Sequence, residues 1–316
     1  MSRIVIMESL GVARKELDAL ERPLKAAGHT FAEYEKTTDP SAMIRQAQDA
    51  DVMILANMPM PGEVISACEN LKFIDVAFTG VDHIGLEAAK AKGIAVSNAS
   101  GYSNEAVAEL VLGMALSLER NMTAVEAACR NGGTKAGLIG RELKGKTVGI
   151  IGLGRIGTRT AELFHAFGCR ILAHSRTVHT DAPDYVEQVG FGELLQRSDI
   201  VSLHCPLNAS TRGMVDAAAL SLMKPTALLI NAARGPVVVS RDLADALDNG
   251  VIAGAGIDVF DQEPPLEGNE PLLHCRNCLV TPHVAFATEE SMILRAGIVF
   301  DNLQAWLDGR QQNVIL

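Results

Sequence analysis

The chain has 316 residues, of which 48% are apolar, 21% charged and 4% aromatic, enough for one large domain or two medium ones. Its 28 Lys and Arg against 38 Asp and Glu leave a net charge of −10, which argues against non-specific binding to nucleic acid or an anionic membrane. No apolar run approaches the ~20 residues of a membrane-spanning helix. The apolar stretch Ile4–Met7 stops at Glu8, so no secretory signal is expected. We expect a soluble, cytoplasmic protein.

Six cysteines are scattered along the chain, and this distribution is not typical of a disulfide framework. Only Cys275 and Cys278 have the spacing of metal ligands, with His274 beside them. A structural zinc site needs four ligands and usually two such pairs. We therefore expect no metal site, and two thiols in a turn before a strand.

The N-terminal third of the chain alternates short apolar runs with helical patterns. The strand-like runs are Arg3–Met7, Val52–Ala56, Phe73–Phe78 and Ile94–Ser97, and the helical patterns are Gly11–Ala27, Ser41–Gln48 and Ile84–Ala91. This alternation is typical of βαβ units, in which the strands are parallel and helices cover the sheet.

A helical segment from Ser103 to Arg130 follows, with Ser103 as a candidate N-cap and Asn131-Gly-Gly as the breaker at its end. The alternation then starts again. The strand-like runs of this second stretch are Thr147–Ile151, Arg170–His174, Asp199–His204, Thr226–Asn231, Val251–Asp258 and Cys278–Thr281. A last helical stretch, Glu289–Leu307, is expected to pack against the first lobe.

These patterns predict an α/β protein made of two doubly wound parallel-sheet lobes. One lobe comprises residues 1–101 and is completed by 287–316, which contain the C-terminal helix. The other lobe comprises residues 102–286. The chain therefore crosses between the lobes twice.

A glycine-rich sequence joins an apolar strand to a helix in the second lobe. The strand-like Val148–Ile151 runs into Gly152-x-Gly154-x-x-Gly157, and the helical pattern Arg159–Phe167 follows. Gly152 permits a tight turn, Gly154 lets the backbone approach a pyrophosphate, and Gly157 lets helix and strand pack closely. The helix N-terminus offers free amides to the phosphates. This context predicts a dinucleotide-binding lobe, the alternative being a tight turn that binds nothing.

The residues expected at the adenosine ribose carry no carboxylate. In dinucleotide sites an Asp or Glu about 20 residues after the glycines binds the ribose 2′-hydroxyl, but here the next strand ends in Ser175, Arg176 and Thr177. A carboxylate would repel a 2′-phosphate, whereas a guanidinium suits phosphate oxygens. The sequence therefore favours NADP over NAD. The alternative is that Arg176 is a solvated surface residue and both cofactors are used.

Three polar residues, Arg234, Glu263 and His283, each follow the carboxyl end of a predicted strand, where α/β sheets bind ligands. An imidazole gives or takes a proton near neutral pH. Glu263 would orient the imidazole of His283 and stabilise its charged form. Arg234 would bind a substrate carboxylate through two parallel hydrogen bonds and stabilise a developing alkoxide. The structural alternatives are a surface glutamate, an ion-paired arginine and one of eight unremarkable histidines.

The motifs and their joint spacing resemble the D-isomer-specific 2-hydroxyacid dehydrogenase family. They are Gly152–Gly157, Ala232-Ala-Arg234-Gly, Asp258-Val-Phe-Asp-Gln-Glu263-Pro and Pro282-His283-Val-Ala, with Thr79-Gly-Val-Asp-His-Ile84, Gly93–Asn98 and Val107-Ala-Glu109 earlier in the chain. Tyr102-Ser103 resembles the glycerate dehydrogenase and hydroxypyruvate reductase branch, whereas Ala99-Ser100 replaces the more usual Ala-Pro. The similarity covers nearly the whole chain.

The resemblance implies a Rossmann cofactor domain (102–286) and a flavodoxin-like substrate domain (1–101 with 287–316). It implies that His283 is the general acid/base, that Glu263 pairs with it and that Arg234 anchors the substrate. The other implied site residues are Arg155 and Ile156 at the pyrophosphate, Cys205, Pro206 and Thr211 along the cofactor, Ala232 and Asp258 beside the nicotinamide, and Thr79 and Gly80 at the substrate carboxylate.

The same resemblance implies reversible hydride transfer between a nicotinamide cofactor and C2 of a small 2-oxo acid, with glyoxylate and hydroxypyruvate as the leading substrates. It also implies a homodimer; the apolar content of the segment from Ser103 fits either the dimer interface or packing between the lobes. Two alternatives share the fold: a dinucleotide-sensing protein like the C-terminal-binding corepressors, and a formate or phosphite dehydrogenase. The acidic composition favours a metabolic enzyme.

Overall fold

Runs of three to five residues, mostly apolar except in the edge strands β2 (Thr30–Glu33) and β8 (Val186–Gln188), form the strands of the structure, a computed structural model that describes residues 1–316. The strands make two separate sheets, one in each of two units. Unit 1 comprises Met1–Ser103 and Ala287–Leu316, and unit 2 comprises Asn104–Phe286. None of the helices combines the length and the apolar character that a membrane crossing requires.

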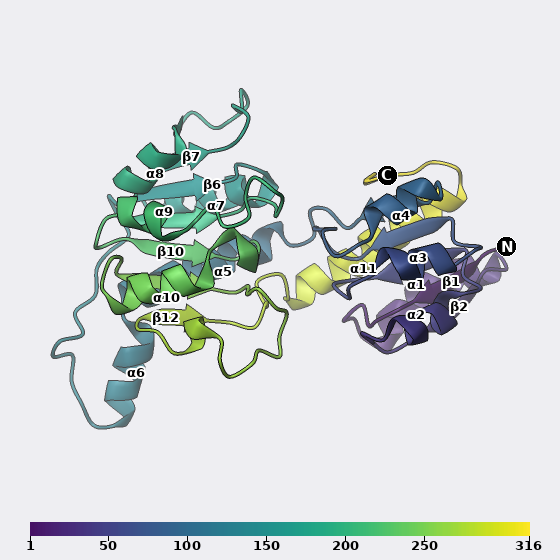
Figure 1. Ribbon diagram of the computed structural model, residues 1–316, viewed down its shortest axis with the longest axis horizontal. Coiled ribbons are helices and arrows are strands. Elements are labelled where there is room, and N and C mark those ends of the chain that lie inside the picture. Colours follow the sequence, from purple (N-terminus) through teal and green to yellow (C-terminus); the bar gives the residue numbers. More distant parts are fainter. The chain divides into compact units, whose positions relative to one another are not determined.

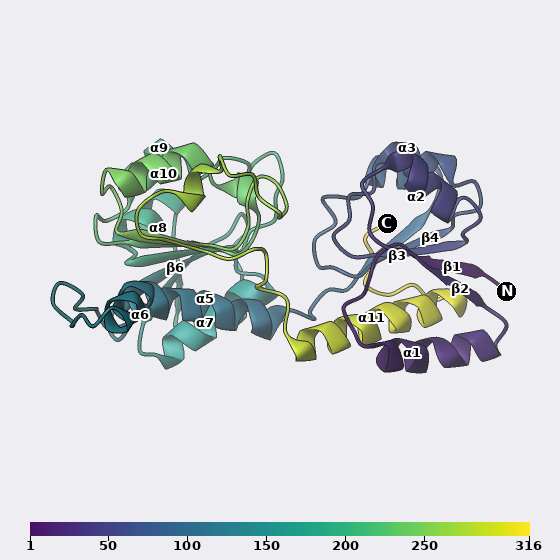
Figure 2. The same cartoon turned by 90° about the horizontal axis from the view of Figure 1, so that it is seen from below.

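Unit 1 contains a five-stranded parallel sheet in the order β2-β1-β3-β4-β5. Its strands are β1 (Arg3–Ile6), β2 (Thr30–Glu33), β3 (Val52–Leu55), β4 (Phe73–Val76) and β5 (Ala95–Asn98), and its helices are α1 (Arg14–Ala26), α2 (Pro40–Ala47), α3 (Gly62–Ala67), α4 (Leu86–Ala91) and α11 (Glu289–Leu307). Figure 2 shows α2 and α3 over one face of the sheet and α1 and α11 over the other. This is the flavodoxin-like strand order.

The C-terminal helix α11 belongs to unit 1, as the sequence predicts. A capping box starts it: Thr288 Oγ1 accepts a hydrogen bond from the Ser291 amide, and the Ser291 hydroxyl accepts one from the Thr288 amide. Its Trp306 ring stacks on Phe73 of β4 with the ring centroids 5.0 Å apart. Residues 233 positions apart in the chain therefore share one core, and α11 completes the lobe.

Beneath α11, β4 carries the buried carboxyl of Asp75. Asn302 Nδ2 donates to Asp75 Oδ1 at 3.0 Å, whereas Oδ2 is buried without a hydrogen-bond partner. Burial raises the pKa of Asp75 well above its ordinary value, because a charged carboxylate loses its hydration there, and the bond from Asn302 opposes the shift only in part. The folded unit therefore favours the protonated acid.

This raised pKa predicts a pH-dependent cost of folding. Above about pH 4 the unfolded chain releases the proton that the folded chain keeps, so stability is lost as pH rises through the folded-state pKa. The asparagine in Asp75→Asn does not titrate. We expect the melting temperature of this variant minus that of the wild type to increase by about 2–4 °C or more between pH 4 and pH 8. Circular dichroism melts of both proteins measure this difference. If the melting-temperature difference between the two proteins is the same at every pH, the pKa of Asp75 is not raised in the folded protein.

Unit 2 contains a seven-stranded parallel sheet in the order β12-β11-β10-β9-β6-β7-β8. Its strands are β6 (Thr147–Ile151), β7 (Arg170–His174), β8 (Val186–Gln188), β9 (Ile200–Leu203), β10 (Leu228–Asn231), β11 (Gly254–Ile257) and β12 (Cys278–Val280). Its helices are α5 (Asn104–Glu119), α6 (Met122–Arg130), α7 (Arg155–Ala166), α8 (Phe191–Arg197), α9 (Ala217–Leu222) and α10 (Ser240–Asp248), with short 3₁₀ turns η1 (Gly235–Val237) and η2 (Pro271–Leu273).

The two faces of the unit 2 sheet carry separate cores. Figure 2 shows α8, α9 and α10 on one face and α5 and α7 on the other. The order reverses between β6 and β9, as in the Rossmann fold, and such a switch point opens a crevice at the carboxyl ends of the strands. The predicted class, two doubly wound parallel-sheet lobes, is confirmed.

Several local predictions are wrong or incomplete. The sequence analysis does not predict β2 or β8, because both lie at sheet edges and their half-exposed residues form no apolar run. It also treats Ser103–Arg130 as one helical segment, whereas Asn121 adopts a left-handed conformation (φ 51°) that separates α5 from α6. Asparagine tolerates that conformation better than most residues. Figure 1 shows α6 extending from the end of α5.

Candidate active site

The glycine loop lies at the switch point of unit 2, between β6 and α7 (Figure 1). Gly152 has φ 100°, and a Cβ there would lie 2.7 Å from the Cys205 amide nitrogen in the loop after β9. A Cβ on Gly157 would overlap the carbonyl oxygen of Gly152. At Gly154, the N-cap of α7, a Cβ would meet nothing within 4 Å. Two glycines are therefore required by packing, while Gly154 leaves open space at the start of a 12-residue helix.

This geometry fits a dinucleotide. The first amides of α7 have no partner within the helix and point toward that space, which suits a pyrophosphate. Arg155 is the exposed first residue of α7, and Ile156 is half-buried beside it. Both positions are those that the sequence analysis assigns to the pyrophosphate, and their roles stay predictions.

The end of β7 lies next to the glycine loop. Ser175 Oγ accepts a hydrogen bond from the Leu153 amide at 2.9 Å, so the side chain predicted to face the ribose also fixes the loop. Arg176 and Thr177 are exposed, and no carboxylate pairs with the Arg176 guanidinium. A cation therefore stands where most NAD sites place an acidic residue.

The loop after β9 forms the other wall of the switch point. Cys205 is buried, and burial raises the pKa of its thiol to about 11. Thr211 Oγ1 donates to the Pro206 carbonyl at 2.7 Å and closes the loop. Sequence reasoning missed His204, whose pKa burial lowers to about 4 and whose Nε2 lies 2.9 Å from Ser202 Oγ. This imidazole is neutral at physiological pH.

Arg234 follows β10 in a loop that Asn231 organises. Asn231 Oδ1 accepts from the Ala233 amide at 3.1 Å, and its Nδ2 donates to the Arg234 carbonyl at 3.0 Å. Arg234 Nη1 donates to the Ala233 carbonyl at 2.8 Å, and the side chain is half-buried. A Cβ on Gly235 would overlap the Phe260 carbonyl, so this glycine lets the loops after β10 and β11 approach one another. Ala232, at the end of β10, is half-buried.

Glu263 and His283 come together although 20 positions separate them. The loops after β11 and β12 carry them, and His283 Nδ1 lies 2.8 Å from Glu263 Oε2 and 3.0 Å from Oε1. The imidazole is 10% exposed and the carboxylate 49%. The Phe286 ring stands edge-on to the imidazole at 90°, with the ring centroids 5.4 Å apart. The imidazole is thus oriented on two sides, and Nδ1–H donates to the carboxylate.

A buried carboxylate holds the loop that carries His283. Asp258 Oδ1 accepts from Thr281 Oγ1 (2.6 Å) and the Val284 amide (2.8 Å), and Oδ2 accepts from the Ala285 amide (2.9 Å). The His283 amide donates to the Asp258 carbonyl at 2.8 Å. Burial raises the pKa of Asp258 even though these donors oppose the shift. The resemblance implies that Asp258 contacts the nicotinamide. The structure adds that it positions the His283 backbone, which has φ 54°.

Thr79 and Gly80 lie in unit 1, shortly after β4. The Thr79 carbonyl accepts from Asn98 Nδ2 at 2.6 Å, while its hydroxyl is buried without a hydrogen-bond partner. Both residues are half-buried and follow the carboxyl end of a parallel strand. Their predicted contact with a substrate carboxylate stays a prediction.

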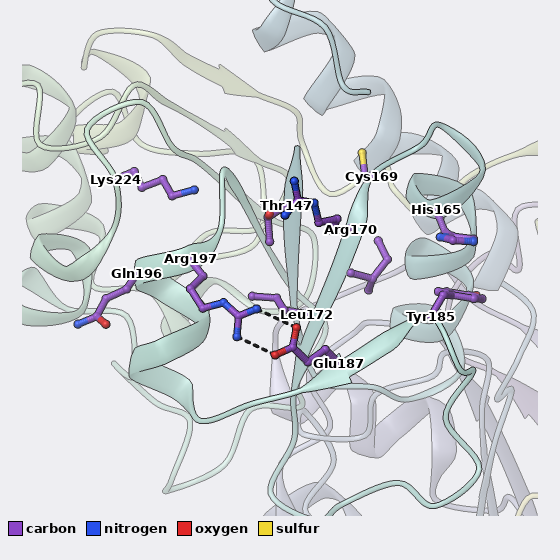
Figure 3. A pocket seen from close by; sticks show the side chains of 11 residues that line it. Thr147, His165, Cys169, Arg170, Leu172, Tyr185, Glu187, Gln196, Arg197 and Lys224 are labelled. Carbon is purple, nitrogen blue, oxygen red and sulfur yellow. Dashed lines mark hydrogen bonds and ion pairs between the residues drawn. The ribbon is translucent and has the colours of Figure 1, made fainter. Parts of the chain in front are cut away.

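A hollow of about 670 Å³ lies at the opposite end of the unit 2 strands. Figure 3 shows Thr147 and Arg170, the first residues of β6 and β7, among its lining side chains, together with the Arg197–Glu187 ion pair and the Tyr185 ring. None of the predicted site residues lines it. No group of three or more His, Cys, Asp or Glu side chains is placed to hold a metal ion.

Comparisons with known proteins show the family to which the chain belongs. Residues 112–285 match the model of the D-isomer specific 2-hydroxyacid dehydrogenase, NAD binding domain. The chain is similar to a hydroxypyruvate reductase of Blautia hydrogenotrophica (34% identical, 99% of each chain covered) and a glycerate dehydrogenase of Methylorubrum extorquens (36%, 96% of each). It is also similar to the structure of an acyclic imino acid reductase in complex with NADPH and D-Arg (27%, TM-score 0.91, 99% of this chain and 100% of that chain).

The chain belongs to the D-isomer specific 2-hydroxyacid dehydrogenase family. It is an oxidoreductase of the class that acts on CH–OH donors, and it uses a nicotinamide dinucleotide. The recognition made from the motifs is confirmed.

Proposed function

We propose that the protein reduces a small 2-oxo acid, glyoxylate or hydroxypyruvate, to the D-2-hydroxy acid with NADPH. The observation that carries this proposal is the Glu263–His283 pair, 2.8 Å from oxygen to nitrogen, at the sheet edge that also holds the glycine loop. Unit 2 is then the cofactor domain and unit 1 the substrate domain. The names of the two curated relatives support this substrate class.

The side chains of unit 2 divide the work of the reaction. Nicotinamide supplies the hydride when it is bound. Because Glu263 accepts from Nδ1, the proton for the substrate carbonyl oxygen is held on His283 Nε2. Glu263 stabilises the imidazolium before transfer and keeps the ring oriented. Arg234 binds the substrate carboxylate and stabilises the charge that develops on the carbonyl oxygen.

A panel of acids tests this function. The absorbance of NADPH is followed with glyoxylate, hydroxypyruvate and bulkier aliphatic or aromatic 2-oxo acids, and the reverse direction with formate and phosphite. We expect turnover with the first two. NADPH binding without turnover of any acid would favour a dinucleotide-sensing protein, and reduction of NADP⁺ by formate or phosphite would favour that type of dehydrogenase.

We also propose that Arg176 selects NADPH through the 2′-phosphate. A charge-assisted hydrogen bond is worth about 1.5–3 kcal/mol, so Arg176→Ala should lower kcat/KM for NADPH about 10–100-fold and leave that for NADH unchanged. Arg170→Ala is a matched control, because Arg170 is also exposed but lies at the opposite end of β7. If Arg176→Ala lowers kcat/KM equally with NADPH and NADH, or lowers neither, Arg176 does not select NADPH.

The protein is proposed to be a homodimer. Helix α6 has no buried residue, and its Met122 is 55% exposed. Ile139, whose carbonyl accepts from Asn121 Nδ2 just before α6, is 83% exposed. A second copy of the chain would cover this surface. Light scattering on the eluting protein should give the mass of two chains, and the mass of one chain would contradict the proposal.

A further inference from the structure

The loop between β7 and β8 carries Arg176 on an exposed stretch of chain. Residues 176–178 are all exposed, and Val178 is 73% exposed. A long charged side chain on such a stretch loses conformational freedom when it binds a ligand, and this loss weakens binding. The loss is smaller where the loop is already fixed before the ligand arrives. The contacts that fix this loop therefore bear on how well Arg176 can hold a phosphate.

The side chain of Gln188 fixes the loop at His179. Gln188 is the last residue of β8, where it lies opposite Ala173 of β7. Its Oε1 accepts a hydrogen bond from the His179 amide at 2.9 Å, and its Nε2 donates to the His179 carbonyl at 2.7 Å. A carboxamide can form both bonds because it carries an acceptor and a donor. One side chain on a strand thus satisfies both main-chain groups of a loop residue.

The two ends of the loop are held as well. Ser175 Oγ accepts from the Leu153 amide of the glycine loop at 2.9 Å. At the other end, the Tyr185 ring stacks on His165 of α7, with the ring centroids 3.9 Å apart and the planes 6° from parallel. The exposed residues 176–178 therefore lie between two fixed points, Ser175 and His179.

Building on the proposed role of Arg176, we propose that Gln188 is a positioning residue for the selection of NADPH. Its two hydrogen bonds hold His179, so that residues 176–178 present the Arg176 guanidinium to the 2′-phosphate. NADH has no 2′-phosphate, so its binding gains nothing from these bonds. The residues proposed for proton transfer follow other strands, β11 and β12, so kcat does not depend on Gln188.

Gln188→Met tests this role, because methionine has a similar length and forms neither hydrogen bond. We expect the affinity for NADPH to fall about 3–10-fold, with the affinity for NADH and kcat unchanged. Fluorescence titrations measure the binding of both cofactors. Calorimetry with adenosine 2′,5′-bisphosphate and with 5′-AMP should show the same difference without turnover. Amide hydrogen exchange across residues 175–185 should become faster in the variant with no ligand present.

Gln196→Met is the matched control, because Gln196 is exposed on α8 and lines the hollow at the opposite end of the strands. It should bind both cofactors as the wild type does. The double variant Arg176→Ala/Gln188→Met should bind NADPH no more weakly than Arg176→Ala alone, because Gln188 acts only through Arg176.

Three results would overturn the role of Gln188. They are an equal loss of NADPH and NADH affinity in Gln188→Met, a further loss when it is added to Arg176→Ala, and unchanged hydrogen exchange in the loop. Arg176→Ala measured alone separates the two proposals. If it weakens NADPH binding while Gln188→Met does not, only the role of Gln188 is wrong. If Arg176→Ala leaves NADPH binding unchanged, the role of Arg176 fails, and that of Gln188 fails with it.

Discussion

Replacing His283 with alanine is expected to lower kcat for glyoxylate reduction by about 10²–10⁴-fold, the range typical of a lost general acid, while NADPH still binds. The carbonyl oxygen gains negative charge as the hydride arrives, and the imidazole held by Glu263 supplies the proton that neutralises it. The glycine loop follows a different strand, β6, from the strands that precede Glu263 and His283, so cofactor binding should survive. Initial rates and NADPH fluorescence titrations measure the two effects separately.

His274→Ala is the matched control for this variant. His274 lies in the β11–β12 connection, which also carries Glu263, and it is exposed. Its Nε2 forms a hydrogen bond with the Gly268 carbonyl at 2.7 Å. We expect wild-type turnover from it. If His283→Ala turns over glyoxylate at nearly the wild-type rate, His283 is not the proton donor and the proposed mechanism is wrong.

Replacing Asp258 with asparagine is expected to lower kcat by about 10²-fold, because a misplacement of the catalytic group by about 1 Å has an effect of that size. Asparagine has the same shape as aspartate, but its side-chain NH₂ group is a donor. That group would face either the backbone N–H of Ala285 or the donors at Oδ1, so two donors would face each other in one buried contact. The loop that fixes the His283 backbone would then shift. The free energy of unfolding should fall by about 1–3 kcal/mol, because the substitution leaves a buried polar group without a hydrogen-bond partner.

Thr281→Val separates positioning from general damage to the fold. This substitution removes only the hydroxyl that donates to Asp258 at 2.6 Å. The hydrogen bonds from the backbone N–H groups of Val284 and Ala285 to Asp258 stay in place. We expect a smaller loss of kcat than for Asp258→Asn. Rates and urea unfolding of both variants make the comparison. Wild-type kcat in a destabilised Asp258→Asn protein would show that the carboxylate stabilises the loop without positioning His283.

The sequence predicted those features that depend on neighbouring residues. The strand before Gly152 and the helix after Gly157 form a local unit, and the structure shows them as β6 and α7. Arg234, Glu263 and His283 follow apolar runs that become β10, β11 and β12. Because all three strands are parallel, their carboxyl ends meet at one edge. The roles of the three residues stay predictions.

Other features were beyond the reach of the sequence, because they depend on what packs against each residue. Nothing local in Thr30–Glu33 or Val186–Gln188 distinguishes an edge strand from a loop, since pairing with one neighbour alone makes the strand. Asp258 has a visible signal, an acid directly after an apolar strand, but its donors belong to a loop more than 20 positions later.

By itself the amino-acid sequence determined the fold class, the dinucleotide loop and which side chains stand at strand ends, because hydrophobic periodicity and glycine positions act over a few residues. Only the tertiary structure decided that the Glu263 carboxylate reaches the His283 imidazole and that Asp258 holds its backbone. These contacts join separate loops, and their distances follow from how neighbouring strands are registered and from what is buried between them.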